Sequence, residues 1–117
     1  MDEVDPMAMA IDQAAEHLQS ALHAVSEAAV DPRALYARTS DLVSVFGRAQ
    51  EVALALSDQI DKARETHELG SDDDTSAEEH VESAARALTR AAAEADDARR
   101  LTDRAWSALS HLMLDGP

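Results

Sequence analysis

Residues 69–79 read Leu-Gly-Ser-Asp-Asp-Asp-Thr-Ser-Ala-Glu-Glu, and this stretch decides how the chain folds. Gly70 suits the left-handed C-terminal cap of a preceding helix, and the small polar residues after it are typical of an exposed loop. Two overlapping capping boxes within residues 75–79 mark the start of another helix. The stretch therefore predicts two helices joined by an acidic loop over residues 70–75, and so short a connection requires them to run antiparallel.

Apolar residues recur at alternating intervals of three and four on both sides of this loop, which predicts helices over about 33–69 and 76–114. Before the loop, the predicted seam consists of Leu35, Arg38, Leu42, Val45, Ala49, Val52, Leu56, Ile60 and Ala63. After the loop, it consists of Val81, Ala84, Leu88, Ala91, Ala95, Ala98, Thr102, Ala105, Leu109 and Leu112. Gly47 interrupts the first of these helices and predicts the close approach of a neighbouring helix, or else a bend.

A third periodic segment precedes both and predicts a helix over about 6–30. Asp5-Pro6 supplies an N-cap followed by proline at the first helical position, and Asp31-Pro32 ends the segment. Its seam consists of Ala8, Ile11, Ala15, Leu18, Leu22, Val25 and Ala29. No segment has a strand pattern. The sequence thus predicts an all-α, coiled-coil-like antiparallel three-helix bundle, in which a long hairpin follows a shorter helix within one domain spanning residues 1–117.

The predicted helices differ in length, and this difference predicts association. At about 1.5 Å per residue, the hairpin extends beyond the cover of the first helix. The seam residues left over are interface candidates: Leu56, Ile60, Val81, Ala84 and Leu88. Trp106 is a sixth candidate, because tryptophan is enriched among interface anchors, although a core position is its commoner use. We expect a homo-oligomer or a complex with a partner helix.

Negative charge is unevenly distributed along the 117 residues, whose formal net charge is −14. Residues 1–32 carry seven acids and no base, and residues 70–80 carry five acids. The antiparallel layout would bring much of this charge to one acidic pole, comprising Asp2, Glu3, Asp5, Asp12, Asp72, Asp73, Asp74, Glu78 and Glu79. Such acids commonly serve solubility and helix capping. Alternatively, they could mimic a phosphate backbone and inhibit a DNA- or RNA-binding protein.

Several kinds of chemistry are not indicated by the sequence. There is no cysteine, no Glu-x-x-His pair, no Gly-x-Ser-x-Gly and no glycine-rich phosphate loop. We therefore expect no enzyme activity, no catalytic residue, no cofactor, no metal site and no small-molecule substrate. The negative charge opposes direct binding to nucleic acid or to an anionic membrane. The acidic start at Asp2 and Glu3 is unlike a signal peptide, so we expect a cytoplasmic protein.

The basic residues and part of the last predicted helix carry a family resemblance. The chain has nine arginines to one lysine, and residues 84–112 contain Ala-Arg-Ala-Leu and Ala-Trp-Ser-Ala-Leu-Ser-His-Leu. This stretch resembles small acidic, alanine-rich helical proteins of actinobacteria, some of them encoded beside plasmid-transfer genes. The resemblance implies no activity. The leading interpretation is a non-enzymatic interaction or accessory protein that associates through its heptad seams, and the alternative is a phage- or plasmid-encoded acidic mimic.

Overall fold

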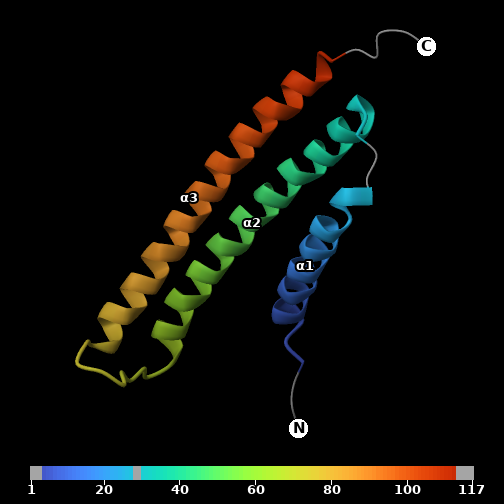
Figure 1. Cartoon of the computed structure of the whole chain (residues 1–117). Coiled ribbons are helices and arrows are strands. Elements are labelled where there is room, and N and C mark those ends of the chain that lie inside the picture. The colour runs from blue at the N-terminus through green and yellow to red at the C-terminus, as the bar shows by residue number, and fades with distance from the viewer. Residues whose placement is uncertain (1–3, 28–29, 113–117) are drawn as a thin grey trace. The chain divides into compact units, whose positions relative to one another are not determined.

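The computed structural model describes residues 4–27 and 30–112, and every regular element in them is helical. The elements are α1 (Pro6–His23), the short 3-10 helix η1 (Val25–Glu27), α2 (Pro32–Thr66) and α3 (Ala77–Ser110) (Figure 1). The predicted all-α class and the three main helices are confirmed. Where the sequence predicts one domain, the chain divides into two compact units, Met1–Asp31 with α1 and η1, and Pro32–Pro117 with α2 and α3.

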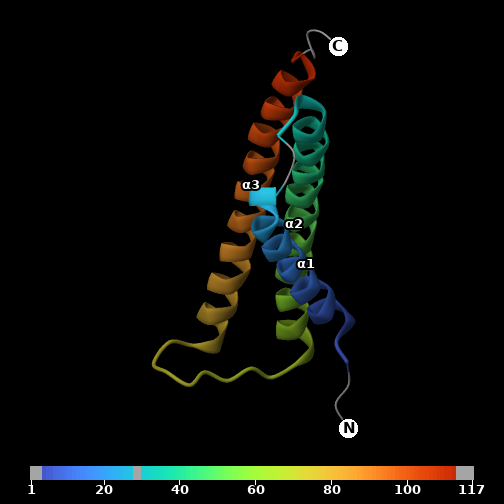
Figure 2. The same cartoon turned by 45° about the vertical axis from the view of Figure 1, so that its right-hand side comes forward.

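The second unit is the predicted hairpin. In two views, α2 and α3 run side by side in opposite directions and are joined by one loop (Figures 1 and 2). The helices have 35 and 34 residues, so each is about 50 Å long. We call the end with the loop the tip, and the end with the start of α2 and the end of α3 the open end.

Within the first unit, α1 begins as the sequence predicts but ends earlier. The Asp5 Oδ1 accepts hydrogen bonds from the backbone N–H groups of Met7 (3.0 Å) and Ala8 (3.1 Å), with proline at the next position. The helix ends at His23 with Ala24 as its C-cap, whereas the proline-based prediction extended it to residue 30. Val25 therefore lies in η1, and the predicted seam residue Ala29 lies outside the described residues. No residue of α1 is buried, so this helix supplies no core.

At the tip, one predicted cap is confirmed and another is wrong. The Ser76 hydroxyl accepts the Glu79 backbone N–H at 3.1 Å and caps α3, as one of the two capping boxes predicts. However, α2 ends at Thr66, three residues before the predicted end. Its last turn is closed by the Thr66 hydroxyl, which donates to the Lys62 carbonyl at 2.8 Å. Gly70 does not have a left-handed φ, so it is not the cap of this helix.

The residues that join α2 to α3 form a regular heptad seam, which we call the inner seam. On α2 it consists of Thr39, Val43, Phe46, Gln50, Ala53, Ser57 and Ile60, all buried or half-buried. On α3 it consists of Val81, Ala85, Leu88, Ala92, Ala95, Arg99, Thr102, Trp106 and Leu109, again all buried or half-buried. The spacing alternates between three and four, as in coiled coils.

The inner seam differs from the predicted seams. On α3 the prediction is right for every second member, including Val81 and Leu88, and wrong for Ala84, Ala91 and Ala105, which are exposed. On α2 it is right only for Ile60: nearly all of the other predicted members directly precede or follow an inner-seam residue. The reason is chemical, because the inner seam contains polar residues such as Gln50 and Arg99, and a search for apolar spacing passes over them.

A buried polar contact lies in the part of the inner seam nearest the tip. Ser57 is 8% exposed, and its hydroxyl donates to the Ala85 carbonyl at 3.1 Å. The Thr89 hydroxyl donates to the same carbonyl at 2.9 Å and lies 3.2 Å from the Ser57 oxygen. Two turns farther from the tip on α3, Ala92 is 2% exposed and is the most buried of the core residues. The contact satisfies the Ser57 hydroxyl only in one register of the two helices.

Aromatic packing closes the open end. The rings of Tyr36 and Trp106 are stacked, with centroids 5.2 Å apart and planes inclined by 28°. Trp106 is thus half-buried within the hairpin, although its Nε1 is buried without a hydrogen-bond acceptor among the described residues. Farther from this end, a Cβ added to Gly47 would lie 3.5 Å from the Cδ of Arg99, an ordinary contact distance. Gly47 therefore lies beside a side chain of α3 at a distance that does not require glycine, and the predicted close approach of a neighbouring helix stays a prediction.

Candidate interaction surface

The hairpin carries a second row of apolar residues that the inner seam does not use. On α2 the row follows Leu35, Leu42, Ala49, Leu56 and Ala63, flanked by Val45 and Val52, and on α3 it follows Ala84, Ala91, Ala98 and Ala105. We call the two rows together the lateral face. Much of it is open to solvent: Leu42 is 40% exposed and Val45 is 36% exposed.

Both rows lie on the same side of the hairpin. Ala49 and Leu56 each directly precede a residue of the inner seam, and so does Ala91 on α3. One residue corresponds to a rotation of about 100° around a helix. Because α2 and α3 are antiparallel, the same rotation in each helix's own direction brings both rows to one side. The lateral face is therefore continuous across the two helices.

The opposite side of the hairpin is polar. The residues that directly follow inner-seam positions there are Ser40, Gly47, Leu54 and Asp61 on α2, and Glu82, Thr89, Asp96 and Asp103 on α3. Asp96 illustrates its character: it receives Arg99 Nη2 at 3.0 Å and Arg100 Nη2 at 2.9 Å within the same helix. Leu54 is the one large apolar residue in this set. We call this the polar side, and the contrast makes the lateral face the candidate interaction surface.

The structure divides the six predicted interface residues between two surfaces. Leu56 and Ala84 belong to the lateral face, whereas Ile60, Val81, Leu88 and Trp106 belong to the inner seam. The predicted seam members Leu35, Leu42 and Ala49 also belong to the lateral face. The sequence pattern therefore detected this surface but assigned it to the contact between the two helices. The apolar sequence pattern is stronger on the lateral face than in the inner seam, because the lateral face has leucine and valine side chains at regular spacing.

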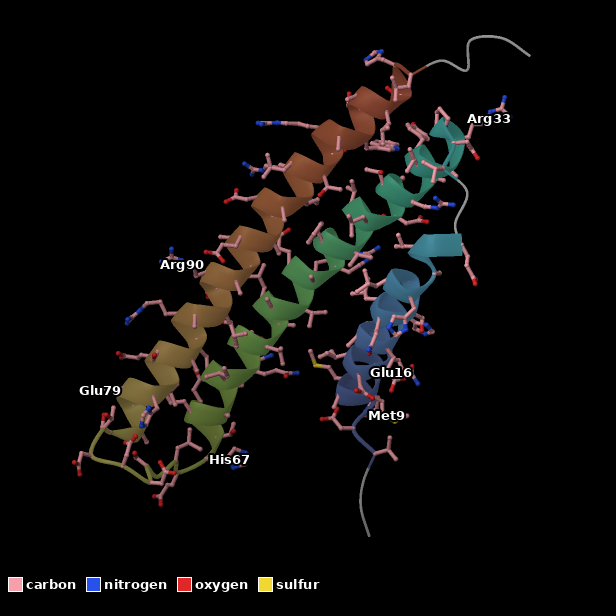
Figure 3. All side chains as sticks on the ribbon, viewed as in Figure 1. Met9, Glu16, Arg33, His67, Glu79 and Arg90 are labelled. Atoms are coloured by element: carbon pink, nitrogen blue, oxygen red, sulfur yellow. The ribbon has the colours of Figure 1, made fainter. Side chains whose placement is uncertain are left out.

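The predicted acidic residues are divided between the two units. Asp2 and Glu3 are outside the described residues, Asp5 is the cap of α1, and Asp12 is exposed on that helix. In the other unit, the tip holds the exposed carboxylates of Asp72, Asp73, Asp74, Glu78 and Glu79. Figure 3 shows Glu79 and His67 at the tip, and Arg33 at the open end.

Hydrogen bonds organise the tip loop around Asp73. Its Oδ1 accepts the Ser71 hydroxyl and the Thr75 backbone N–H, each at 2.8 Å, and lies 2.8 Å from His80 Nε2. The hydrogen bond from His80, helped by those from Ser71 and Thr75, lowers the pKa of Asp73. This arrangement is that of a loop closed against the first turn of a helix, and it accounts for Asp73 without a ligand.

A small hollow lies beside this loop. Its volume is about 220 Å³, and it is lined by Arg64, His67, Leu69, Ala77, Glu78 and Val81. Arg64 Nη1 bridges to Glu78 Oε1 at 2.9 Å across its wall, and this hydrogen bond raises the pKa of the guanidinium. Pockets for small molecules usually measure about 300–1,000 Å³. The hollow is below that range, so we base no ligand site on it.

Neither a metal-binding cluster nor a membrane-spanning helix is found in the described part of the chain. No group of three or more His, Asp or Glu side chains there is arranged to hold a metal ion. No helix there is both long and apolar enough to cross a membrane. Comparisons with protein-family models, with curated proteins and with solved structures gave no match to this chain.

Proposed function

We propose that this protein is a non-enzymatic interaction or accessory protein that associates, with itself or with a partner helix, through an apolar face of its helical hairpin. The observation that carries the proposal is the lateral face, a continuous row of leucine, valine and alanine beside an inner seam that already holds the hairpin together. Amphipathic helices bind in such grooves through residues spaced by three and four positions. The cytoplasm and an actinobacterial type of host belong to the proposal as expectations from the sequence.

Burial supports the proposal. In the described residues, only Ser57, Val81 and Ala92 are buried. Two helices of this length that bury so little have a thin core, because most helical stability in proteins comes from packing of an apolar face. Covering leucine and valine side chains contributes about 1.5–3 kcal/mol for each one fully buried. An occupant of the lateral face would therefore stabilise the hairpin as well as bind it.

A matched pair of variants tests the proposal. Leu42 on the lateral face and Leu54 on the polar side lie in the same helix and are 40% and 45% exposed. We expect Leu42→Asp to weaken association by about 2 kcal/mol or more, since it places a charge in an apolar contact. Leu54→Asp should leave association unchanged. Sedimentation velocity measures self-association, and calorimetric titration measures binding to a partner purified from the native host. Equal behaviour of the two variants would contradict the proposal.

The acidic-mimic alternative predicts the reverse. Changing Asp72, Asp73 and Asp74 together to Asn should reduce binding by no more than about 1 kcal/mol if the lateral face is the binding surface, because exposed charges contribute little. A mimic should instead lose its partner on this change and should also be released by high salt. If the triple variant loses binding while Leu42→Asp retains it, the protein is an acidic mimic.

A further inference from the structure

We propose that the occupant of the lateral face is the same face of a second copy, and that the two hairpins lie antiparallel, with the tip of each beside the open end of the other. This inference rests on the proposed function and names its partner. The result would be a four-helix assembly with one two-fold axis across the middle of the helices, a common architecture for pairs of helical hairpins. Three observations support it: the length of the face, its small residues and the charge at its two ends.

The face is long and needs a long occupant. From Leu35 to Ala63 it covers 28 residue steps of α2, or about 42 Å. The 18 residues of α1 would span only about 27 Å. A second hairpin, whose helices have 35 and 34 residues, matches the whole length. The alanine row of α3 permits the close approach of another helix along this length, since only methyl groups stand between the two backbones.

Charge selects the antiparallel arrangement. Around the tip, residues 61–82 carry nine acids and two bases, a net charge of −7. At the open end, residues 33–51 and 96–112 together carry six arginines and five acids, a net charge of +1, which includes the pairs of Glu51 with Arg48 and of Asp96 with Arg99 and Arg100. Parallel hairpins would bring two acidic tips together, whereas antiparallel hairpins bring each acidic tip to arginines. Like-charge contacts of this kind exclude wrong arrangements, and opposite charges favour the right one.

Full overlap of the helices defines which residues meet. The middle residue of α2 (Pro32–Thr66) is Ala49, which belongs to the lateral face. With the two-fold axis at this level, Ala49 lies beside Ala49 of the second copy. Leu35 then lies beside the second copy's Ala63, and Leu42 beside its Leu56. Residues of the lateral face on α2 thus meet residues of the lateral face on the second copy's α2, because these positions are whole heptads apart.

Single-cysteine cross-linking of the full chain tests this arrangement, because the protein has no cysteine of its own. Ala49→Cys should cross-link to itself through a disulfide or a short thiol-reactive linker. A mixture of Leu35→Cys and Ala63→Cys chains should give the mixed cross-linked dimer in excess over either self-linked dimer. Leu54→Cys on the polar side is the matched control and should give none. Each variant is first checked by circular dichroism, and sedimentation should show that the unmodified chain is a dimer.

Each other outcome overturns the inference in a recognisable way. Preferential cross-linking of Leu35→Cys with Ala105→Cys chains would mean a parallel pair, because a two-fold axis along the helices sets α2 of one copy against α3 of the other. A monomer in which the thiol of Ala49→Cys reacts at least tenfold more slowly than that of Leu54→Cys would mean that residues 6–23 or another segment covers the face. In both cases the inference fails while the proposed function can still hold. A monomer whose two thiols react equally fast, and which no partner protects, would overturn both.

Discussion

The inner seam and the lateral face lie side by side on the same two helices, yet they differ in chemistry. Five of the sixteen inner-seam residues are polar, among them Ser57, Gln50 and Arg99, and all sixteen are buried or half-buried. The lateral face is almost wholly apolar, and Leu42 and Val45 are more than a third exposed. A covered surface can include polar groups as long as each finds a partner, as the Ser57 hydroxyl does. An apolar surface that is exposed gains nothing from its composition until something covers it, so burial and composition together distinguish the surface that holds the hairpin from the one that is left open.

The sharpest test of this comparison uses two neighbouring alanines. Ala92 belongs to the inner seam and is 2% exposed, whereas Ala91 belongs to the lateral face and is exposed. Ala92→Asp should destabilise the hairpin by about 3 kcal/mol or more, because it buries an unpaired charge. Ala91→Asp should leave the helix content unchanged and weaken association only. Thermal unfolding followed by circular dichroism separates the two effects, and equal losses of stability would mean that the two surfaces are not distinct.

Variants of the aromatic pair test the inner seam at the open end of the hairpin. Trp106→Ala should cost about 3 kcal/mol of folding free energy, because it removes a large half-buried ring that stacks on Tyr36. Trp106→Phe should stay within about 1 kcal/mol of the native protein, since it keeps a stacked ring and removes a buried N–H that has no acceptor. Denaturant unfolding of both variants measures this. A Trp106→Phe loss as large as that of Trp106→Ala would show that the indole N–H is needed.

A smaller, stabilising effect is expected at Gly47. Its position on the polar side leaves room for a methyl group 3.5 Å from Arg99 Cδ. Gly47→Ala should therefore stabilise the hairpin by up to about 1 kcal/mol, the difference in helix propensity between the two residues. Denaturant midpoints of the two proteins check the prediction. A destabilised variant would mean that the helices approach more closely there than the side-chain geometry indicates.

The smallest effect is expected at the tip, which belongs to neither surface. The pKa of Asp73 is lowered in the folded chain, so its contribution to stability is present above the ordinary carboxyl pKa of about 4 and is lost as the pH falls through the lowered value. His80→Ala should raise the pKa of Asp73 toward its ordinary value and reduce this acid dependence. Carboxyl titration by NMR measures the pKa, and Asp72→Asn is the control that should leave it unchanged. An unaltered Asp73 pKa in His80→Ala would contradict the assigned cause.

Much of the fold could be predicted from the sequence, and the parts that could not have identifiable physical causes. Proline and capping residues located the starts of α1 and α3, because each satisfies backbone groups locally. The end of α1 was missed, since the helix ends at His23, nine residues before the proline that was used to predict it. On α2 the predicted seam lies one residue before the inner seam, because a search for apolar spacing selects Leu42 and passes over Gln50 whatever each residue contacts. The lateral face was therefore visible in the sequence, and only its separation from the contact between α2 and α3 required the structure. The signal that could have found Arg99 and Trp106 in the inner seam is their own spacing of seven residues, the heptad repeat.

The contacts of the hairpin also differ in how much chain they enclose. Arg64 and Glu78, next to the tip, are 14 residues apart in sequence, Ser57 and Ala85 are 28 apart, and Tyr36 and Trp106 are 70 apart by their numbers. The entropy lost in closing a loop grows with its length, so a pair near the tip meets at lower cost than a pair near the open end. Once the tip pair has formed, each further turn adds only a short loop to the part already paired. The hairpin should therefore fold in the manner of a zipper, beginning beside the acidic loop and ending when the two aromatic rings stack, and it should fray in the reverse order.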